Sequence, residues 1–158
     1  VNVMRQTISM SGGNPIYAKG TGSSTQLTAT VNGTVGNDAV AWTSGNTNIA
    51  KVSGGKVTGV GAGTVTITAT SGKLKATYKL TVKNPTFTLT KSSATIAKGK
   101  TTTIKSKAAP ASKVTYISSN RKVATVTSKG VVKGIRKGKA TITVKCNGIT
   151  KKFVVTVK

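Results

Sequence analysis

The chain has 158 residues, of which 25 are Lys or Arg and only Asp38 is acidic, so its formal net charge is +24. It has no His and no Glu, which leaves Asp38 and deprotonated lysine as general bases. A single acidic residue and a single cysteine, Cys146, cannot assemble a calcium or zinc site. We therefore predict a protein that is not an enzyme and has no cofactor.

Two halves of the sequence repeat each other. The stretch Trp42-Thr-Ser-Gly-Asn-Thr-Asn-Ile-Ala-Lys-Val returns as Tyr116-Ile-Ser-Ser-Asn-Arg-Lys-Val-Ala-Thr-Val, at an offset of 74. An internal period of this size predicts two small domains, residues 1–83 and 84–158. A domain of about 75 residues buries only about 60% of the surface of its unfolded chain. Each copy is therefore expected to lack a deep catalytic pocket.

In the first copy, turns are predicted at three glycines and strands between them. Gly20 ends the tripeptide Ala-Lys-Gly, and Gly59 and Gly63 follow the Trp42 stretch. Residues 64–70 then alternate between apolar residues and threonine, and residues 76–83 alternate in the same way. Alternation of this kind is typical of antiparallel strands with one face on a core.

The second copy shows the same order of elements. Gly99, Gly134 and Gly138 recur at the turns, and residues 152–158 alternate like residues 76–83. Recurrence at turns predicts a positive φ or a close backbone approach at these glycines. Counting from turn to turn gives seven or eight short strands per copy. The sequence therefore predicts an all-β fold of two tandem immunoglobulin-like β-sandwich domains.

Four aromatic residues and the cysteine are expected to contribute to the two cores. Trp42 and Tyr116 are equivalent in the repeat, and Tyr78 and Phe153 lie at inward positions of the last strand of each copy. We interpret all four as core anchors. Cys146 lies on the side of its strand that carries Ile142 and Val144, which indicates a half-buried packing residue.

Both copies resemble the bacterial immunoglobulin-like domain, group 2. The motif reads Tyr116-Ile-Ser-Ser-Asn120, Val123-Ala-Thr-Val126, Lys129-Gly-Val-Val-Lys-Gly-Ile135 and Gly138-Lys-Ala-Thr-Ile-Thr143 in the second copy, with counterparts from Trp42 to Thr68 in the first. The resemblance implies a building block of bacterial surface proteins, adhesins or phage virions, and hence an extracellular location on a cell surface or a virion. The family pattern contains no catalytic residues to transfer.

The charge is unevenly distributed between the copies. Residues 1–83 hold eight basic residues and Asp38, giving +7, whereas residues 84–158 hold seventeen basic residues and no acid, giving +17. Such a charge favours anionic partners. The candidate contact residues surround the most basic turn of the second copy: Lys133, Arg136, Lys137 and Lys139, with Arg121 and Lys122. The alternative is a solvated turn, with lysines that keep the protein soluble and protect strand edges.

We therefore expect a non-catalytic structural or adhesive module that meets an acidic surface of a protein partner or of its own assembly. One alternative is a module that binds a polyanion, either a cell-wall polymer or, weakly and without sequence specificity, a nucleic acid. Another is a homo-oligomer or filament in which Val1–Arg5 adds to the sheet of a neighbouring copy. No apolar run is long enough for membrane insertion. Because the sequence begins at Val1 rather than Met, we expect a processed or excised fragment.

Replacing Trp42 by alanine tests its role in the first core. Truncation of a buried tryptophan costs about 3–5 kcal/mol, so Trp42→Ala should unfold the first copy. Thermal unfolding followed by circular dichroism measures the change. A variant that melts like the parent would show that Trp42 is not a core residue.

Overall fold

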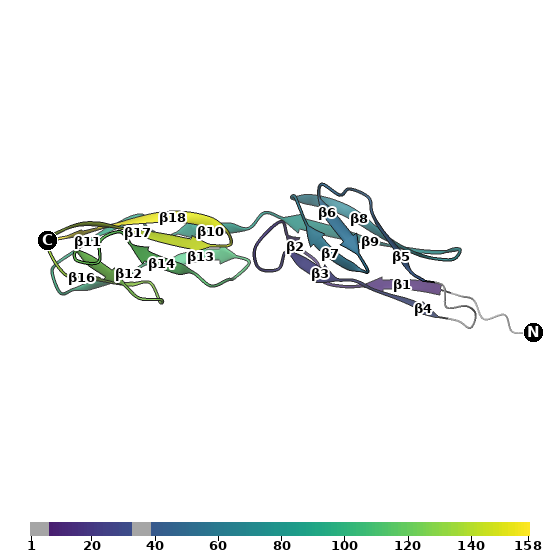
Figure 1. Cartoon of the computed structure of the whole chain (residues 1–158), viewed down its shortest axis with the longest axis horizontal. Helices are drawn as coiled ribbons and strands as arrows, with labels where there is room; N and C mark the ends of the chain where they lie inside the picture. Colours follow the sequence, from purple (N-terminus) through teal and green to yellow (C-terminus); the bar gives the residue numbers. More distant parts are fainter. Residues whose placement is uncertain (1–6, 33–38) are drawn as a thin grey trace, which may run out of the picture. The chain divides into compact units, whose positions relative to one another are not determined.

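The computed structural model describes residues 7–32 and 39–158; Asp38 and the Val1–Arg5 segment lie outside the described residues. The chain divides into two compact units, Val1–Asn84 and Pro85–Lys158, called the first and second domains below. In the described ranges each domain consists of nine strands without a helix (Figure 1). No helix suited to crossing a membrane is therefore present in those ranges.

The strands of the first domain are β1 (Thr7–Ser11), β2 (Ile16–Tyr17), β3 (Ser24–Gln26), β4 (Thr28–Asn32), β5 (Ala41–Ser44), β6 (Ala50–Ser53), β7 (Lys56–Gly59), β8 (Gly63–Ser71) and β9 (Leu74–Lys83). Those of the second domain are β10 (Thr86–Leu89), β11 (Ser93–Ile96), β12 (Thr101–Thr103), β13 (Ser106–Ala109), β14 (Thr115–Ser118), β15 (Ala124–Val126), β16 (Val131–Gly134), β17 (Gly138–Cys146) and β18 (Ile149–Val157).

The two domains have the same strand order. The first contains a four-stranded sheet β2-β9-β8-β5, a three-stranded sheet β3-β7-β6 and the pair β1-β4. The second repeats this arrangement as β11-β18-β17-β14, β12-β16-β15 and β10-β13. Pairing is antiparallel except for β2–β9 and β11–β18, which are parallel. The predicted fold of two tandem immunoglobulin-like sandwiches is therefore confirmed.

The count of nine strands exceeds the expected seven or eight because one strand of each domain changes its partner midway. In the first domain, β3 pairs with β7 and β4 pairs with β1, and only Leu27 separates β3 from β4. The Leu27 amide donates to the Gly55 carbonyl at 2.8 Å, and the Ile104 amide donates to the Gly130 carbonyl at 2.9 Å. Such a change of partner leaves no break in the apolar pattern that sequence analysis could detect.

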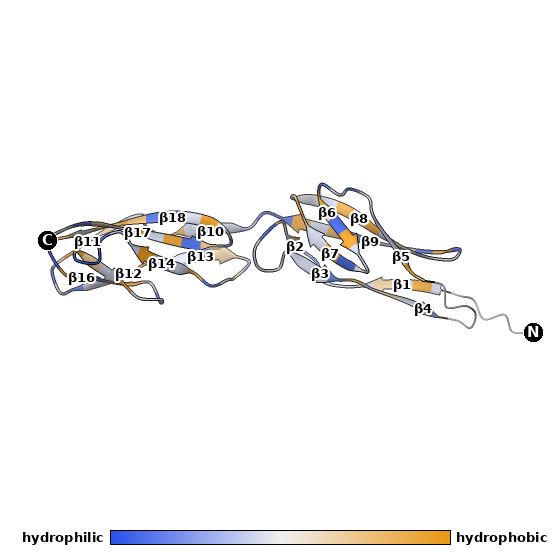
Figure 2. Ribbon diagram, viewed as in Figure 1, coloured by the Kyte–Doolittle hydropathy of each residue, from blue (hydrophilic) through white to orange (hydrophobic). Residues whose placement is uncertain are grey.

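In each core the inward residues of the longest hairpin pack with buried residues of the other strands. In the β8–β9 pair, Ile67 and Leu80 are fully buried, and in the β17–β18 pair Ile142 and Val155 are fully buried. Outward neighbours are mostly threonine and lysine, so hydrophobic and hydrophilic residues mix along single strands (Figure 2). The alternation therefore separates one apolar cluster per domain from a polar outer surface.

The four aromatic residues expected in the cores differ in burial. Phe153 is buried, whereas Trp42, Tyr78 and Tyr116 are partly buried and pack against the core clusters. The Tyr78 hydroxyl also donates to the Gly12 carbonyl at 2.9 Å. Each of these three rings therefore covers the edge of a core instead of filling its centre.

The turn glycines have the geometry that their recurrence predicts. Gly20, Gly63, Gly99 and Gly138 have positive φ, and Gly59 and Gly134 lie against neighbouring backbone, so the prediction is confirmed. A further glycine, Gly130, has φ +78°, and a Cβ added there would lie 2.8 Å from the Tyr116 ring. Both the backbone conformation and the ring therefore require glycine at this position.

We predict that Gly130→Ala destabilises the second domain more than Gly99→Ala does. Both residues have a φ near +80°, where a side chain costs about 1–3 kcal/mol, but nothing lies within 4 Å of a Cβ at Gly99. Circular dichroism would follow both domains, and the fluorescence of Trp42, the single tryptophan, would follow the first alone. Equal destabilisation by the two variants would contradict a contact between Gly130 and the Tyr116 ring.

Candidate contact surface

One end of the second domain is formed by a turn and a loop that are bonded to each other. The turn joins β16 to β17 and carries Arg136 and Lys137, while the loop joins β14 to β15 and carries Arg121 and Lys122. The amides of Ile135 and Arg136 both donate to the Val123 carbonyl, at 2.8 and 3.3 Å. Four of the six predicted contact residues are thus brought together at this end.

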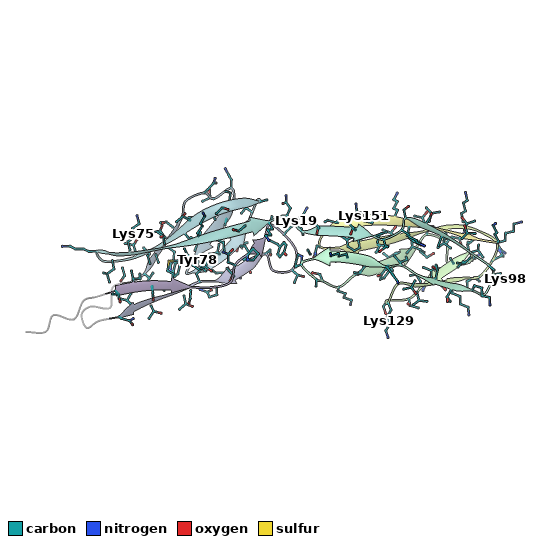
Figure 3. The ribbon with its side chains drawn as sticks, turned by 180° about the vertical axis from the view of Figure 1, so that it is seen from behind. Lys19, Lys75, Tyr78, Lys98, Lys129 and Lys151 are labelled. Atoms are coloured by element: carbon teal, nitrogen blue, oxygen red, sulfur yellow. The ribbon has the colours of Figure 1, made fainter. Side chains whose placement is uncertain are left out.

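A third segment adds two lysines that sequence analysis did not select, Lys98 and Lys100. The Gly99 amide donates to the Gly134 carbonyl at 2.8 Å, and the Gly134 amide donates to the Lys100 carbonyl at 3.0 Å. Lys98 is visible at this end of the domain (Figure 3). The sequence carries no signal for this proximity, because it depends on the parallel pairing of β11 with β18.

We call the exposed residues Lys98, Lys100, Arg121, Lys122, Arg136 and Lys137 the basic end. No carboxylate side chain occurs among residues 84–158 to neutralise them. Six like charges on three adjoining segments repel one another and attract any anion that approaches this end. The basic end is therefore suited to a large anionic surface or polymer.

The other two predicted contact residues lie on different faces of the sandwich. Lys133 projects from β16, where its register partners are Thr101 and Thr125. Lys139 projects from β17 in the four-stranded sheet, opposite Thr156. The turn between them passes from one sheet to the other, so side chains only six positions apart point away from each other. The structure places Lys133 and Lys139 beside the basic end and not within it.

The backbone of the loop in the basic end is held by residues that both copies share. The Ser118 hydroxyl donates to the Ala124 carbonyl at 2.6 Å, and Asn120 Oδ1 accepts from the Lys122 amide at 3.1 Å. The first domain has the same two bonds, at 2.6 Å from Ser44 and 3.0 Å to Asn46. The loop shape is thus common to both domains, and the difference lies in the exposed side chains.

Those exposed side chains are neutral in the first domain. By register and loop position, Thr47 and Asn48 take the places of Arg121 and Lys122. Gly61 and Ala62 take those of Arg136 and Lys137, and the Gly61 amide donates to the Ile49 carbonyl as Arg136 does to Val123. The first domain therefore has uncharged residues at these four positions.

The described residues contain no group of three or more His, Cys, Asp or Glu that could hold a metal ion. Cys146 is 3% exposed, and its Sγ donates to the Ser112 carbonyl at 3.6 Å. Cys146 is thus more deeply buried than the half-buried position expected, because β17 carries it beneath the loop between β13 and β14.

The model of the bacterial Ig-like domain (group 2) matches residues 6–82 and 84–157. The chain belongs to this family. These two matches coincide with the two repeats, so each domain is one group 2 unit. The residues that hold the loops, Ser44 and Asn46 with Ser118 and Asn120, lie within the motif that both units share.

Among curated proteins, the group 2 pair is similar to a kappa-carrageenase from Pseudoalteromonas carrageenovora, with 54% identity over 55 residues. The match covers 32% of this chain and 14% of the enzyme. Domains 4–9 of the S-layer protein SbsC match 100% of this chain and 31% of theirs, with 24% identity and a TM-score of 0.46. An intimin mutant of EHEC O157:H7 matches 55% of this chain and 51% of its own, with 28% identity and a TM-score of 0.39.

We predict that the thiol of Cys146 reacts slowly in the folded protein. At 3% exposure a reagent reaches Sγ only when the loop between β13 and β14 opens. Ellman's reagent should therefore modify the native protein far more slowly than the protein in denaturant. Equal rates in both conditions would show that the thiol is accessible in the fold.

Proposed function

We propose that this pair of domains is a non-catalytic contact module of an outer surface, either of a bacterial cell or of a phage virion. Its second domain meets an anionic partner through the basic end. The observation that carries the proposal is the meeting of six exposed cationic residues on three bonded segments at one end of a domain without acidic side chains. Membership of the group 2 family supports the surface setting.

The energetics favour a partner that presents many charges. One exposed ion pair contributes only about 0–1 kcal/mol, and salt screens it further. Six cations in one place add attraction over the width of the end and speed association with an anionic surface. Several copies of the module on one particle or cell would multiply weak contacts into firm attachment.

A nucleic acid fits this surface less well than an acidic protein surface or a cell-wall polymer does. Single-strand binders stack bases on exposed aromatic rings, but Tyr116 and Phe153 in the second domain pack on its core. Major-groove readers usually insert a helix, and the described residues form strands. Binding to DNA or RNA would therefore be electrostatic and blind to sequence.

The first domain supplies the substitutions for a test. Arg121→Thr, Lys122→Asn, Arg136→Gly and Lys137→Ala together place its residues on the same backbone and remove four charges. We expect weaker binding to polyaspartate and to oligo(dT), two anionic probes of different chemistry. For oligo(dT), the slope of log K against log salt should fall by about 0.7 for each phosphate that the variant no longer neutralises.

A matched control removes the same number of charges elsewhere in the second domain, at Lys113, Lys129, Lys145 and Lys151. Equal losses of affinity in the two quadruple variants would show that net charge alone drives binding, and the proposal would fail. The single variants Lys133→Thr and Lys139→Thr would measure how much each flanking lysine contributes to binding. Threonine is the residue that the first domain has at both positions. Stronger retention of oligo(dT) than of polyaspartate at all salt concentrations would favour a phosphate polymer as partner.

A further inference from the structure

A groove of about 520 Å³ opens along one side of the second domain, between the edge strands of its two sheets. Among the residues that the structure describes, one wall is β11, which pairs with β18 alone, and the other is β12, which pairs with β16 alone. Ala94, Ile96 and Phe153 form its apolar lining, and threonines 101–103 line the β12 side. The groove lies along strand edges, and its lining includes none of the side chains of the basic end.

The backbone of β11 is free to pair on the groove side. The Val154 amide donates to the Ser92 carbonyl and the Lys158 amide to the Ile96 carbonyl, so the even-numbered residues face β18. In a parallel ladder the alternate residues, Ser93 and Thr95, direct their amide and carbonyl groups to the other side. These groups can accept one further strand.

In the first domain residues 13–14 take the place of β11, because Ile16 pairs with Val82 as Ile96 pairs with Val157. Thr25, two residues before the partner change at Leu27, corresponds to Thr102 before Ile104. The Gly13 amide donates to Thr25 Oγ1 at 3.1 Å, and Asn14 Oδ1 accepts from the Thr81 amide at 3.0 Å. The segment in the place of β11 is thus bonded to both sheets in the first domain, whereas Thr102 lines an open groove in the second.

The charges around the groove select an acidic occupant. Lys91 and Lys105 line the groove, and Lys98 and Lys100 follow the other end of β11. The four residues of β11 span about 13 Å, so an added strand would have lysines near both of its ends. A second copy of this chain, at a net charge of +24, would be repelled.

We propose that this groove binds an extended acidic segment of another protein, which adds to β11 as a strand. Main-chain hydrogen bonds to Ser93 and Thr95 hold the segment, apolar side chains at alternate positions contact Ala94 and Ile96, and acidic residues at both ends meet the lysines. The proposal goes beyond the contact at the basic end, because it depends on backbone pairing along β11 and shares with the basic end only the flanking Lys98 and Lys100.

The test uses the peptide Asp-Glu-Val-Thr-Val-Thr-Glu-Asp and two variants of the whole chain. Thr95→Pro removes a groove-facing amide but none of the amides that pair with β18, whereas Thr95→Ala keeps the amide and removes only the side chain. Titration should show roughly ten-fold weaker binding for Thr95→Pro, the loss expected for about one hydrogen bond. Thr95→Ala should bind within about two-fold of the parent.

A second measurement does not depend on how the proline variant folds. Hydrogen exchange at the Ser93 and Thr95 amides of the parent chain should slow when the peptide is added. Unchanged exchange at saturation, or equal binding by Thr95→Pro and Thr95→Ala, would overturn the proposal. Equal binding of a peptide with Lys in place of every Asp and Glu would also overturn the proposal. The same holds if the parent chain associates with itself and the Thr95→Pro variant does not.

The quadruple variant of the basic end separates the two proposals. It retains β11, β12 and the lysines beside the groove, so it should bind the peptide within about two-fold of the parent. A loss of peptide binding in that variant would assign the peptide to the basic end and overturn the groove site. Normal peptide binding with lost polyaspartate binding supports both sites independently.

Discussion

Only alternate residues of a strand can reach the core of a sandwich, and this constraint governs both domains. Each core depends on one long hairpin whose inward residues are kept in kind between the copies, as with Ile67 and Ile142 or Leu80 and Val155. A domain of this size has little apolar area to lose, so the inward positions tolerate little change. The outward positions carry no such restriction, so the two copies can share a fold while differing by ten units of charge, +17 against +7.

The loops separate shape from chemistry in the same way. Ser118 and Asn120 hold the loop between β14 and β15 by side-chain bonds, and Ser44 and Asn46 do the same in the first domain. Arg121 and Lys122 follow these holding positions and are exposed, as are Thr47 and Asn48, so these side chains can differ on one backbone shape. One scaffold thus displays neutral residues at these loop positions in the first domain and basic residues in the second. The comparison within a single chain shows that the charge is a property of selected exposed positions and not of the fold.

Open strand edges are the other consequence of a small sandwich, because neither sheet closes on itself. Lysines lie beside these edges, and Lys151 shares the inward phase of the buried Phe153 while remaining exposed. Such residues discourage pairing with other strands of like charge. The same lysines would attract an acidic strand, as proposed for β11, so repulsion of like-charged strands and attraction of acidic ones have one physical origin. The groove between β11 and β12 and the basic end would both favour partners rich in carboxylate or phosphate.

Much of this architecture could be predicted from the sequence, because hydrophobic alternation and turn glycines are local signals. They indicated the β-sandwich class, the repeat and the turn geometry at residues such as Gly99 and Gly138. The composition of the contact surface could not be predicted in full. Lys133 and Lys139 are close to Arg136 in sequence, yet the turn between two sheets sends them to opposite faces, while parallel pairing of β11 with β18 brings Lys98 and Lys100 in from a distant segment. The sequence by itself determined which residues face inward and how much charge remains outside. Only the tertiary structure decided which of those charges meet and which strand edges stay open, because both depend on pairing between segments that are remote along the chain.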